Sequence, residues 1–172
     1  KKIKNQKLIA DFLMEEGKIL SSKGQHEAGT ETFKKALKNY TSINLTIGKL
    51  QALNALGIIH KRQGEFIESL GYLEQAIELF DNTTPPGRKA AVYNNLTNVY
   101  ASTNQFALAY EMAFKALKYF EEAKNNRGVG LICGNISSFY KGRGNKEKAL
   151  EYCQKSIDIL KKENDLKGQI NG

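Results

Sequence analysis

Apolar side chains recur every three or four residues through most of this chain, and short polar or glycine-containing breaks separate the apolar runs. The first run, over residues 3–22, carries Leu13 and Leu20 on one side at the spacing of an α-helix. A break follows at Gly24, and glycine suits the left-handed residue that ends a helix. The helical spacing then resumes over residues 26–40. This pattern predicts two helices joined by a tight turn.

The same helix pair returns three more times at a fixed step of 40 residues. The predicted turn residues are Gly24, Gly64, Asn104 and Gly144, and a small residue recurs in the second helix at Ala36, Ala76, Ala116 and Ser156. Internal repeats of roughly 20–50 residues are typical of stacked repeat architectures. The sequence therefore predicts four units, at about 3–42, 43–82, 83–122 and 123–162.

The strongest break in the helical pattern is the stretch 81–87, which contains both prolines of the chain, Pro85 and Pro86. The 40-residue phase is unchanged across this stretch. We therefore interpret it as a connection followed by a helix start, where proline is tolerated, and not as a domain boundary. The whole chain, 1–172, is predicted to form a single domain.

Residues 163–172 match the start of a fifth unit, because Gly168 lies 40 residues after Gly128. The second helix of the fourth unit would then present a face without a complete neighbouring unit. The first residue is Lys, so we interpret the sequence as an excised fragment.

The repeated residues resemble the tetratricopeptide repeat, whose pattern is a large residue, then Leu-Gly, Tyr, Ala, a second large residue and a closing Pro. The matching residues are Leu13, Glu16, Gly17, Leu20, Gly29, Phe33 and Ala36 in the first unit, Leu53, Leu56, Gly57, His60, Ser69, Leu73 and Ala76 in the second, Tyr93, Leu96, Thr97, Tyr100, Ala109, Ala113 and Ala116 in the third, and Cys133, Ile136, Ser137, Tyr140, Ala149, Cys153 and Ser156 in the fourth. The resemblance covers essentially the whole chain. It implies an all-α fold, a right-handed superhelical solenoid of antiparallel helix pairs with four repeats plus the start of a fifth.

Small residues in this pattern are expected where the two helices of a unit cross closely, as Gly17 opposite Gly29 and Thr97 opposite Ala109. Two features depart from the usual repeat. The step is 40 residues where the usual step is about 34, and Asp81 stands at the place of the closing proline. We expect both helices to be about a turn longer. Repeats of this length resemble those of bacterial signalling proteins, such as peptide-sensing regulators and the sensor regions of some histidine kinases.

A second stripe on each first helix resembles the lining of the concave groove in this family. In the four units this stripe holds Asp11, Met14, Lys18 and Ser21, then Gln51, Asn54, Ile58 and Lys61, then Ala91, Asn94, Asn98 and Ala101, and finally Leu131, Gly134, Ser138 and Lys141. Asn95 and Asn135 lie one position away from it. Some members of this family hold a terminal carboxylate with Lys and Asn at the second and third stripe positions. No unit of this chain has Lys at the second position, so we do not expect such a clamp.

The amides of this stripe are the main candidates for partner binding, because a side-chain amide both donates and accepts hydrogen bonds and so pairs with a peptide backbone of any sequence. The candidate residues are Asn54, Asn94, Asn95, Asn98, Asn135, Gln51, Lys61 and Lys141. For Asn95 and Asn135 the alternative is a hydrogen bond to the neighbouring helix. For Asn94 and Asn98, which lie one turn apart, we favour the groove.

The net charge of +8, from 26 basic and 18 acidic residues, permits an acidic partner. Lys61, Arg62 and Lys141 either border a groove for such a partner or lie at solvated helix ends. Lys and Glu alternate along the second helices, and this mixture argues against nucleic-acid binding, which requires clustered basic residues and exposed aromatic rings. The apolar runs are too short to span a membrane.

No group of residues indicates catalysis. His26 and His60 lie in different units, and His60 replaces the Tyr of the repeat, so we expect it to be a packed core residue. The sequence contains no set of His, Cys, Asp and Glu at metal-binding spacing, and the basic turn 142–146 lacks the spacing of a phosphate-binding loop. We predict that the protein is not an enzyme and has no cofactor.

Cys133 and Cys153 fall on the two helices of the fourth unit. We expect two free, buried thiols, because cysteine is also a normal small core residue. A disulfide is the alternative, and two cysteines leave the redox compartment open.

These features together predict a non-catalytic scaffold that binds a protein or a peptide in its groove, within a larger signalling or regulatory protein. The alternative is self-association into a homo-oligomer, through the exposed face of the C-terminal repeat or through the convex surface. A further alternative is the sensory segment of a larger signalling enzyme.

Overall fold

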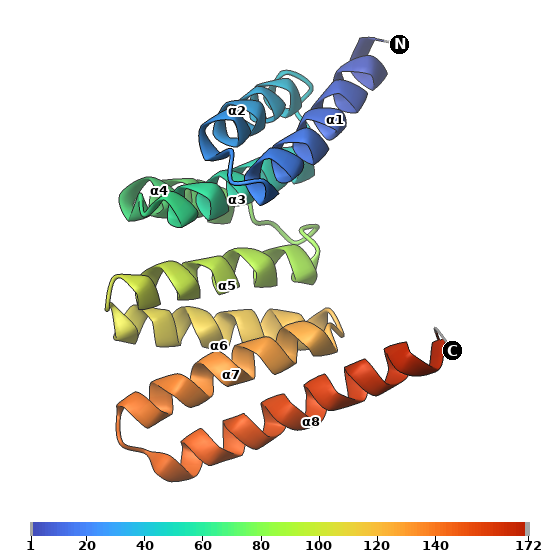
Figure 1. Cartoon of the computed structure of the whole chain (residues 1–172). Helices are drawn as coiled ribbons and strands as arrows, with labels where there is room; N and C mark the ends of the chain where they lie inside the picture. The colour runs from blue at the N-terminus through green and yellow to red at the C-terminus, as the bar shows by residue number, and fades with distance from the viewer. Residues whose placement is uncertain (1, 171–172) are drawn as a thin grey trace. The chain divides into compact units, whose positions relative to one another are not determined.

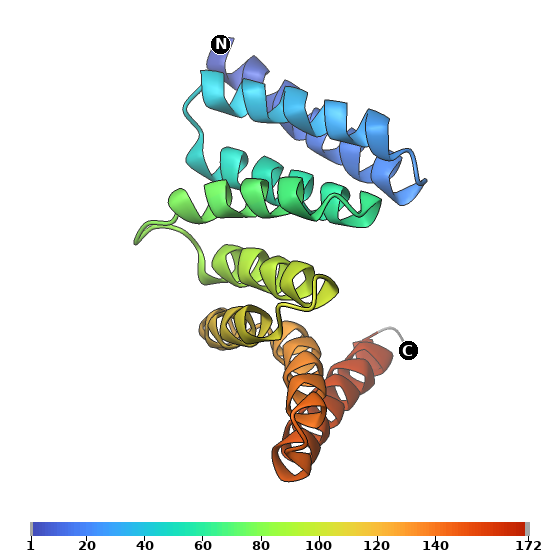
Figure 2. The ribbon, with the colours of Figure 1, turned by 90° about the vertical axis from the view of Figure 1, so that its left-hand side faces the viewer.

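The computed structural model describes the backbone of residues 2–170 and the side chains of residues 3–163. Within the described backbone the chain forms eight helices and no strand, which confirms the predicted all-α class (Figures 1 and 2). The helices are α1 (Lys2–Ser22), α2 (His26–Ser42), α3 (Thr46–Gln63), α4 (Phe66–Glu78), α5 (Pro86–Ser102), α6 (Phe106–Glu122), α7 (Asn126–Gly142) and α8 (Lys146–Ile170).

The helices belong to two compact units. Unit 1 spans Lys1–Thr84 and contains α1 to α4, and unit 2 spans Pro85–Gly172 and contains α5 to α8. The boundary lies inside the proline-containing stretch 81–87. The single domain over 1–172 stays a prediction.

The four turns predicted inside the repeats are present. Their backbone φ angles are positive, at 77° for Gly24, 80° for Gly64, 59° for Asn104 and 75° for Gly144. After the first of them, the N–H of Gln25 donates to the carbonyl of Leu20 at 3.0 Å. A left-handed residue followed by this long-range hydrogen bond ends a helix and reverses the chain. The sequence pattern located these turns because glycine and asparagine adopt the left-handed conformation readily.

The helix start at the paired prolines is also confirmed. Pro85 is the N-cap residue and α5 begins at Pro86. Proline is tolerated there because the first backbone N–H groups of a helix have no partner within the helix. The connection at Lys124 was not foreseen, because a lysine adopts the left-handed conformation there, with φ of 52°.

Each repeat depends on a close crossing of its two helices at small residues. In the first repeat, a Cβ added to Gly29 would lie 3.4 Å from the backbone oxygen of Gly17. In the second, the buried hydroxyl of Ser69 donates to the carbonyl of Gly57 at 2.6 Å. These are equivalent positions of the 40-residue repeat, so the predicted crossing is confirmed.

The crossings of unit 2 use the same positions with different residues. In the third repeat, Thr97 and Ala109 are both fully buried. In the fourth, the Ser137 hydroxyl donates to the carbonyl of Ala149 at 2.6 Å. The hydroxyl donor is thus on the second helix in one repeat and on the first helix in another. Both arrangements satisfy a polar group at a buried contact.

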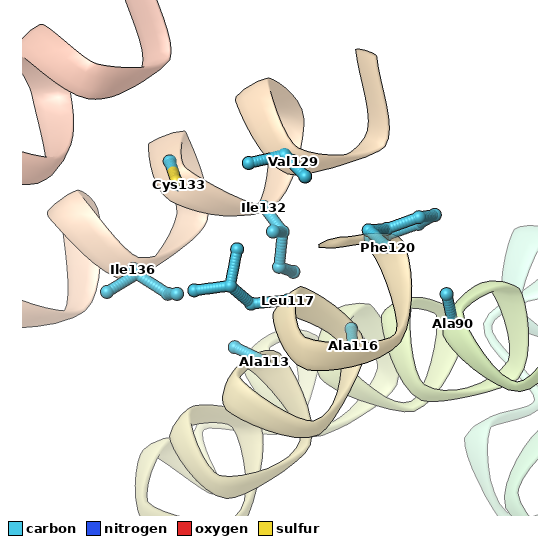
Figure 3. Packing of buried hydrophobic residues seen from close by; sticks show 9 residues of the cluster. All are labelled: Ala90, Ala113, Ala116, Leu117, Phe120, Val129, Ile132, Cys133 and Ile136. Carbon is cyan, nitrogen blue, oxygen red and sulfur yellow. The ribbon is translucent and has the colours of Figure 1, made fainter. Parts of the chain in front are cut away.

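Successive repeats inside each unit pack a second helix against the next first helix. Between α2 and α3, the ring of Tyr40 lies over Gly48, so closely that any Cβ there would overlap the ring. Between α6 and α7, Phe120 covers Gly128 in the same way. Beside that pair, Leu117 packs in one buried cluster with Ile132 and Ile136, and Figure 3 shows these side chains between the two helices.

The residues predicted to begin a fifth repeat instead continue α8, which runs without a turn to Ile170. Asn164 is equivalent to Asn44, where the chain does turn, with φ of 52°. At Asn44 the following helix α3 packs against α2, and the N–H of Leu45 closes the turn on the carbonyl of Tyr40 at 2.9 Å. Helical hydrogen bonds are local, so without such packing the helix continues. Residues 171–172 and the side chains of 164–170 lie outside the described part.

The expectation of two buried thiols is wrong for one of them. Both cysteines are free, and Cys133 is buried whereas Cys153 is exposed. Burial raises the pKa of the Cys133 thiol. Cys153 lies on the face of α8 that corresponds to the buried face of α6, where Ala113 is fully buried by the next repeat.

Glycine-to-alanine substitutions at Gly48 and Gly71 should change the free energy of unfolding in opposite directions, because only Gly48 lies under a ring, that of Tyr40. Gly48→Ala should lower the free energy of unfolding by about 1–3 kcal/mol, because the added methyl group overlaps a buried ring. Gly71→Ala on α4 should raise it by about 0.5–1 kcal/mol, because no atom lies within 4 Å of the new Cβ and alanine favours the helix. Urea unfolding of both variants measures the difference. Equal effects of the same sign would contradict this packing.

Candidate functional site

The first helices of unit 1 border a hollow of about 170 Å³. Its lining residues are Asp11, Met14, Glu15, Lys18, Tyr40 and Gln51. Four of them, namely Asp11, Met14, Lys18 and Gln51, belong to the stripe predicted from the sequence. The structure thus brings stripe residues of α1 and α3 together around one opening.

Two hydrogen bonds hold the Asp11 carboxylate at this hollow. Its carboxylate accepts a hydrogen bond from Lys7 Nζ at 2.8 Å and another from the Tyr40 hydroxyl at 2.7 Å. The hydrogen bond from Lys7 lowers the pKa of Asp11, against the opposing effect of burial, and the Tyr40 hydroxyl lowers it further. Burial and the neighbouring Asp11 carboxylate raise the pKa of Tyr40. At neutral pH the site therefore holds a fixed carboxylate beside a protonated phenol.

The hollow can bind a group that donates hydrogen bonds. Asp11 and Glu15 supply carboxylate oxygens, and the amide of Gln51 is able both to donate and to accept. Lys18 adds one cation, which is paired with Glu15 at 2.5 Å. This lining is of mixed charge, whereas the net charge of the whole chain led us to consider an acidic partner.

One end of the stripe in unit 1 is engaged in the fold. Ser21 is buried and its hydroxyl accepts a hydrogen bond from Arg62 Nη1 at 2.9 Å, which ties α3 to α1. Arg62 thus contributes to helix packing. Lys61 and Asn54 are half-buried on α3, and Asn54, like Gln51, already has an interaction partner within the chain.

The remaining amide candidates lie in unit 2. Asn94, Asn95 and Asn98 are half-buried on α5, and Asn135 is half-buried on α7. Asn95 already interacts within the chain, in line with the alternative of a bond to a neighbouring group. Lys141 is exposed at the end of α7.

Asn54 and Asn94 are one repeat apart in sequence but belong to different compact units, as do Lys61 and Lys141. A continuous row of amides and a shared basic border therefore stay predictions.

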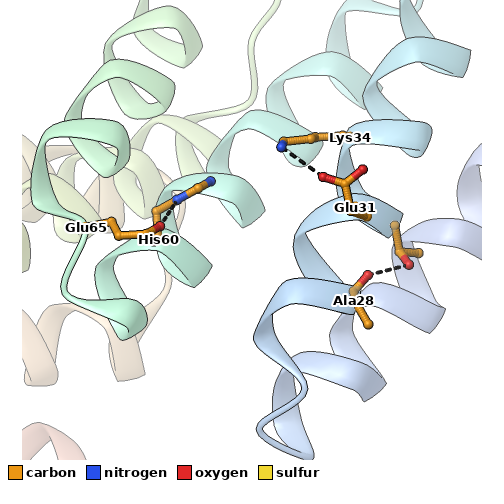
Figure 4. A network of polar contacts seen from close by, with 6 residues as sticks. Ala28, Glu31, Lys34, His60 and Glu65 are labelled. Atoms are coloured by element: carbon orange, nitrogen blue, oxygen red, sulfur yellow. Dashed lines mark hydrogen bonds and ion pairs between the residues drawn. The ribbon is translucent and has the colours of Figure 1, made fainter.

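His60 is a packed residue, as the sequence predicted. It is 9% exposed, its Nδ1 lies 2.5 Å from Glu65 Oε2, and its ring stacks on Tyr72 at 5.1 Å between centroids. Figure 4 shows His60 beside Glu65, together with the exposed ion pair of Lys34 and Glu31, whose charged atoms are 2.9 Å apart. No cluster of three or more metal-ligating side chains occurs among the described residues.

An aromatic cluster in unit 2 was only partly foreseen. Tyr140, expected to be a packing residue, is half-buried, shares a hydrogen bond of 2.7 Å with the Tyr110 hydroxyl and stacks on Tyr152. This hydrogen bond, together with burial, raises the pKa of Tyr110 to about 12. The cations of Arg143 and Lys148 lie over the Tyr110 and Tyr140 rings, at 5.5 and 5.3 Å from the centroids. Tyr110 and Tyr152 lie outside the repeat signature, so the sequence pattern gave them no role.

A second hollow of unit 1, about 580 Å³ in volume, lies beside the first turn. It is lined by Gly24, Gln25, His26, Glu27, Ala28 and Gln63. The sequence offered no signal for it beyond the glycine turn.

None of the described helices is long and apolar enough to cross a membrane.

Models of the tetratricopeptide repeat match most of the chain. One matches residues 8–82 and 49–126, and a second matches residues 131–161. No curated protein sequence matches the chain.

Several solved structures resemble the fold. BtubC (BKLC) from P. vanneervenii has 23% sequence identity and a TM-score of 0.81, over 92% of this chain and 66% of that one. MamA has 23% identity and a TM-score of 0.69, over 91% and 81%. Aspartyl phosphate phosphatase F from Bacillus subtilis has 17% identity and a TM-score of 0.87, over 93% of this chain but only 42% of the phosphatase. At these identities the similarity concerns the fold alone.

The hydrogen bonds of Asp11 predict a pH-dependent contribution to stability. Because the pKa of Asp11 is lowered in the folded state, its stabilising effect is present above the ordinary carboxyl pKa of about 4 and is lost as the pH falls through the folded-state value. Asp11→Asn should therefore reduce the free energy of unfolding at neutral pH by less than about 1 kcal/mol, since the side chain is 43% exposed. Urea unfolding at decreasing pH should show this difference shrinking below about pH 4. A difference that stays constant down to about pH 3 would contradict the assignment.

Proposed function

This chain belongs to the tetratricopeptide repeat family, and from that premise we propose that it is a non-catalytic scaffold that binds a protein or peptide segment along the first helices of its repeats. The observation that carries the proposal is the hollow between α1 and α3, where stripe residues of two successive repeats border one opening. A segment lying across α1 and α3 contacts both repeats at once.

The chemistry of the stripe favours an extended or helical peptide held by its backbone. Asn94 and Asn98 in unit 2 offer amides that pair with peptide N–H and C=O groups. Asp11 and Glu15 add acceptors for a donor group of the partner. Binding in a preformed groove of this kind uses little rearrangement of the scaffold.

The basic residues of the second helices support a protein partner more than a nucleic acid. Four lysines there are paired with glutamates, namely Lys34 with Glu31, Lys115 with Glu111, Lys118 with Glu122 and Lys155 with Glu121. Such local pairing weakens the continuous positive potential that a phosphate backbone requires. The net charge of +8 still favours a partner with some acidic character.

We place this scaffold within a larger signalling or regulatory protein. Support comes from the likeness to aspartyl phosphate phosphatase F, of which this chain spans 42%. The proposal takes from that likeness only the repeat scaffold and extends no phosphatase activity to this chain.

A second candidate function is self-association. It is favoured by one observation, which is that large apolar side chains are exposed on α8, with Leu150 at 71% and Ile157 at 53% exposure. Their equivalents in α6 include Leu117, which is 7% exposed because α7 covers it. The apolar face of α8 is a better surface for this role than the faces of the second helices that carry the charge pairs.

The binding proposal predicts that combining Asn94→Ala and Asn98→Ala weakens peptide binding at least tenfold, because two adjacent amides of the stripe are lost. A peptide selected on the wild-type chain from a random display library serves as the probe, and calorimetry gives its Kd. The melting temperature should hardly change, since both side chains are only half-buried.

The matched control removes two exposed amides from second helices, by Gln75→Ala and Gln154→Ala, and should leave the Kd unchanged. A lower melting temperature with an unchanged Kd for the asparagine variant would show that Asn94 and Asn98 serve the fold and not the binding of a partner.

A further inference from the structure

The connection between α7 and α8 carries four basic side chains within eight residues. In this basic segment, 141–148, the side chains of Lys141, Arg143, Lys146 and Lys148 are exposed, and Glu147 is the acidic residue among them. Among residues 3–163 no carboxylate forms an ion pair with any of the four, in contrast to the paired lysines of the second helices. Their charges are therefore accessible to a partner.

The basic segment lies in the more basic of the two compact units. Residues 85–172 contain 14 basic and 8 acidic residues, which gives them +6 of the net charge of +8. The excess of positive charge in the chain is thus a property of unit 2, and the basic segment is its densest part.

Two cations of the basic segment lie over aromatic rings. The guanidinium of Arg143 is 5.5 Å from the centroid of Tyr110, and Nζ of Lys148 is 5.3 Å from the centroid of Tyr140. A ring attracts a cation at such distances and thereby restricts the side chain that carries it. A side chain that is already restricted loses less conformational entropy when it binds a partner. The two charges are held in place and still exposed.

The rings beneath these cations are fixed by three helices. The hydroxyls of Tyr110 on α6 and Tyr140 on α7 share a hydrogen bond of 2.7 Å. Tyr140 stacks on Tyr152 of α8 with 5.6 Å between the centroids, and Phe114 of α6 lies edge-on to Tyr152 at 6.1 Å. The two cations therefore lie on a platform that the packing of α6, α7 and α8 holds in place.

The equivalent stack in unit 1 shows that the platform does not require these cations. His60 and Tyr72, at the same positions two repeats earlier, stack with 5.1 Å between their centroids. The positions of the two cations are held there by Gln63 and Glu68, one neutral and one acidic. Since the stack forms with these residues as well, the positive charges of unit 2 serve a role other than the fold.

We infer that the basic segment binds an acidic segment of a partner protein, one rich in aspartate and glutamate. A guanidinium binds a carboxylate through two parallel hydrogen bonds, and a lysine ammonium adds a point charge. Clusters of such cations are a recurrent means of recognising acidic motifs. This surface goes beyond the proposed groove, because Lys141 is its one residue on the stripe of the first helices. It also gives the acidic partner suggested by the net charge a place on the molecule.

The rings favour a protein over a nucleic acid as this partner. Single-stranded nucleic acids bind by stacking their bases on free aromatic faces. Here Tyr140 already stacks on Tyr152, and cations lie over both Tyr110 and Tyr140. Glu147, and Glu151 one turn later, also interrupt the continuous positive potential that a phosphate backbone requires.

Fluorescence anisotropy with a labelled octaglutamate peptide at low ionic strength tests this inference in the 172-residue chain. The wild-type chain should bind this peptide and should not bind a neutral peptide of alternating glycine and serine. Combining Arg143→Gln with Lys148→Gln should weaken binding about tenfold, because two exposed charge pairs with the peptide are lost. An unchanged melting temperature will show that the variant is folded.

The matched control combines Lys35→Gln with Lys38→Gln on α2, where both lysines are exposed. It removes the same net charge from unit 1 and should bind octaglutamate as the wild type does.

Three outcomes would overturn the inference. Equal weakening in both double variants would show that binding follows the net charge and not the basic segment. A wild-type chain that does not bind octaglutamate would exclude an acidic peptide as the partner. Tighter binding of a thymidine octanucleotide, lost in the variant of Arg143 and Lys148, would assign the basic segment to nucleic acid. None of these outcomes affects the groove proposal, because both double variants keep Asn94 and Asn98, whose role has its own readout.

Discussion

The fold of each repeat depends on the close approach of its two helices at one crossing. Where Gly17 meets Gly29 the backbones approach so closely that an added Cβ would lie 3.4 Å from a backbone oxygen. Where a side chain is present, as at Ser69 and Ser137, its hydroxyl donates to the carbonyl of the facing helix at 2.6 Å. The crossing sets the separation of the two helices, so the remaining positions of the repeat acquire fixed roles. This is why residues 40 positions apart have similar surroundings although their side chains differ.

The sequence was sufficient to predict the helix pairs, the four turns and the crossings, because each is a local property of a few residues. Gly24 and Asn104 end helices through their own backbone preference, and paired prolines can begin a helix but not continue one. Features that depend on neighbouring packing were not predictable in the same way. Asn164 has the same identity as Asn44, yet α8 continues past it. Cys153 shares its repeat position with buried residues but is exposed.

The candidate site was predictable as a stripe and not as a detailed geometry. Periodicity selected Asp11, Met14, Lys18 and Gln51, which the structure brings around one hollow. It could not show that Tyr40, a core residue by its position, donates to Asp11 at 2.7 Å, because that contact joins residues from two helices whose relative rotation depends on the packed structure. The amides of unit 2 occupy their predicted helices, and their role in binding rests on chemistry that periodicity alone does not test.

The central claim of this account is that the close crossing of its two helices determines the fold of each repeat. Urea unfolding of two glycine variants tests it most directly, because Gly17 lies at the crossing of the first repeat, whereas Gly142 ends α7 with no atom within 4 Å of an added Cβ. We expect Gly17→Ala to lower the free energy of unfolding by about 1–3 kcal/mol, because the added methyl group overlaps the ring of Phe33. Gly142→Ala should not lower it. Equal effects of the two substitutions would contradict the claim.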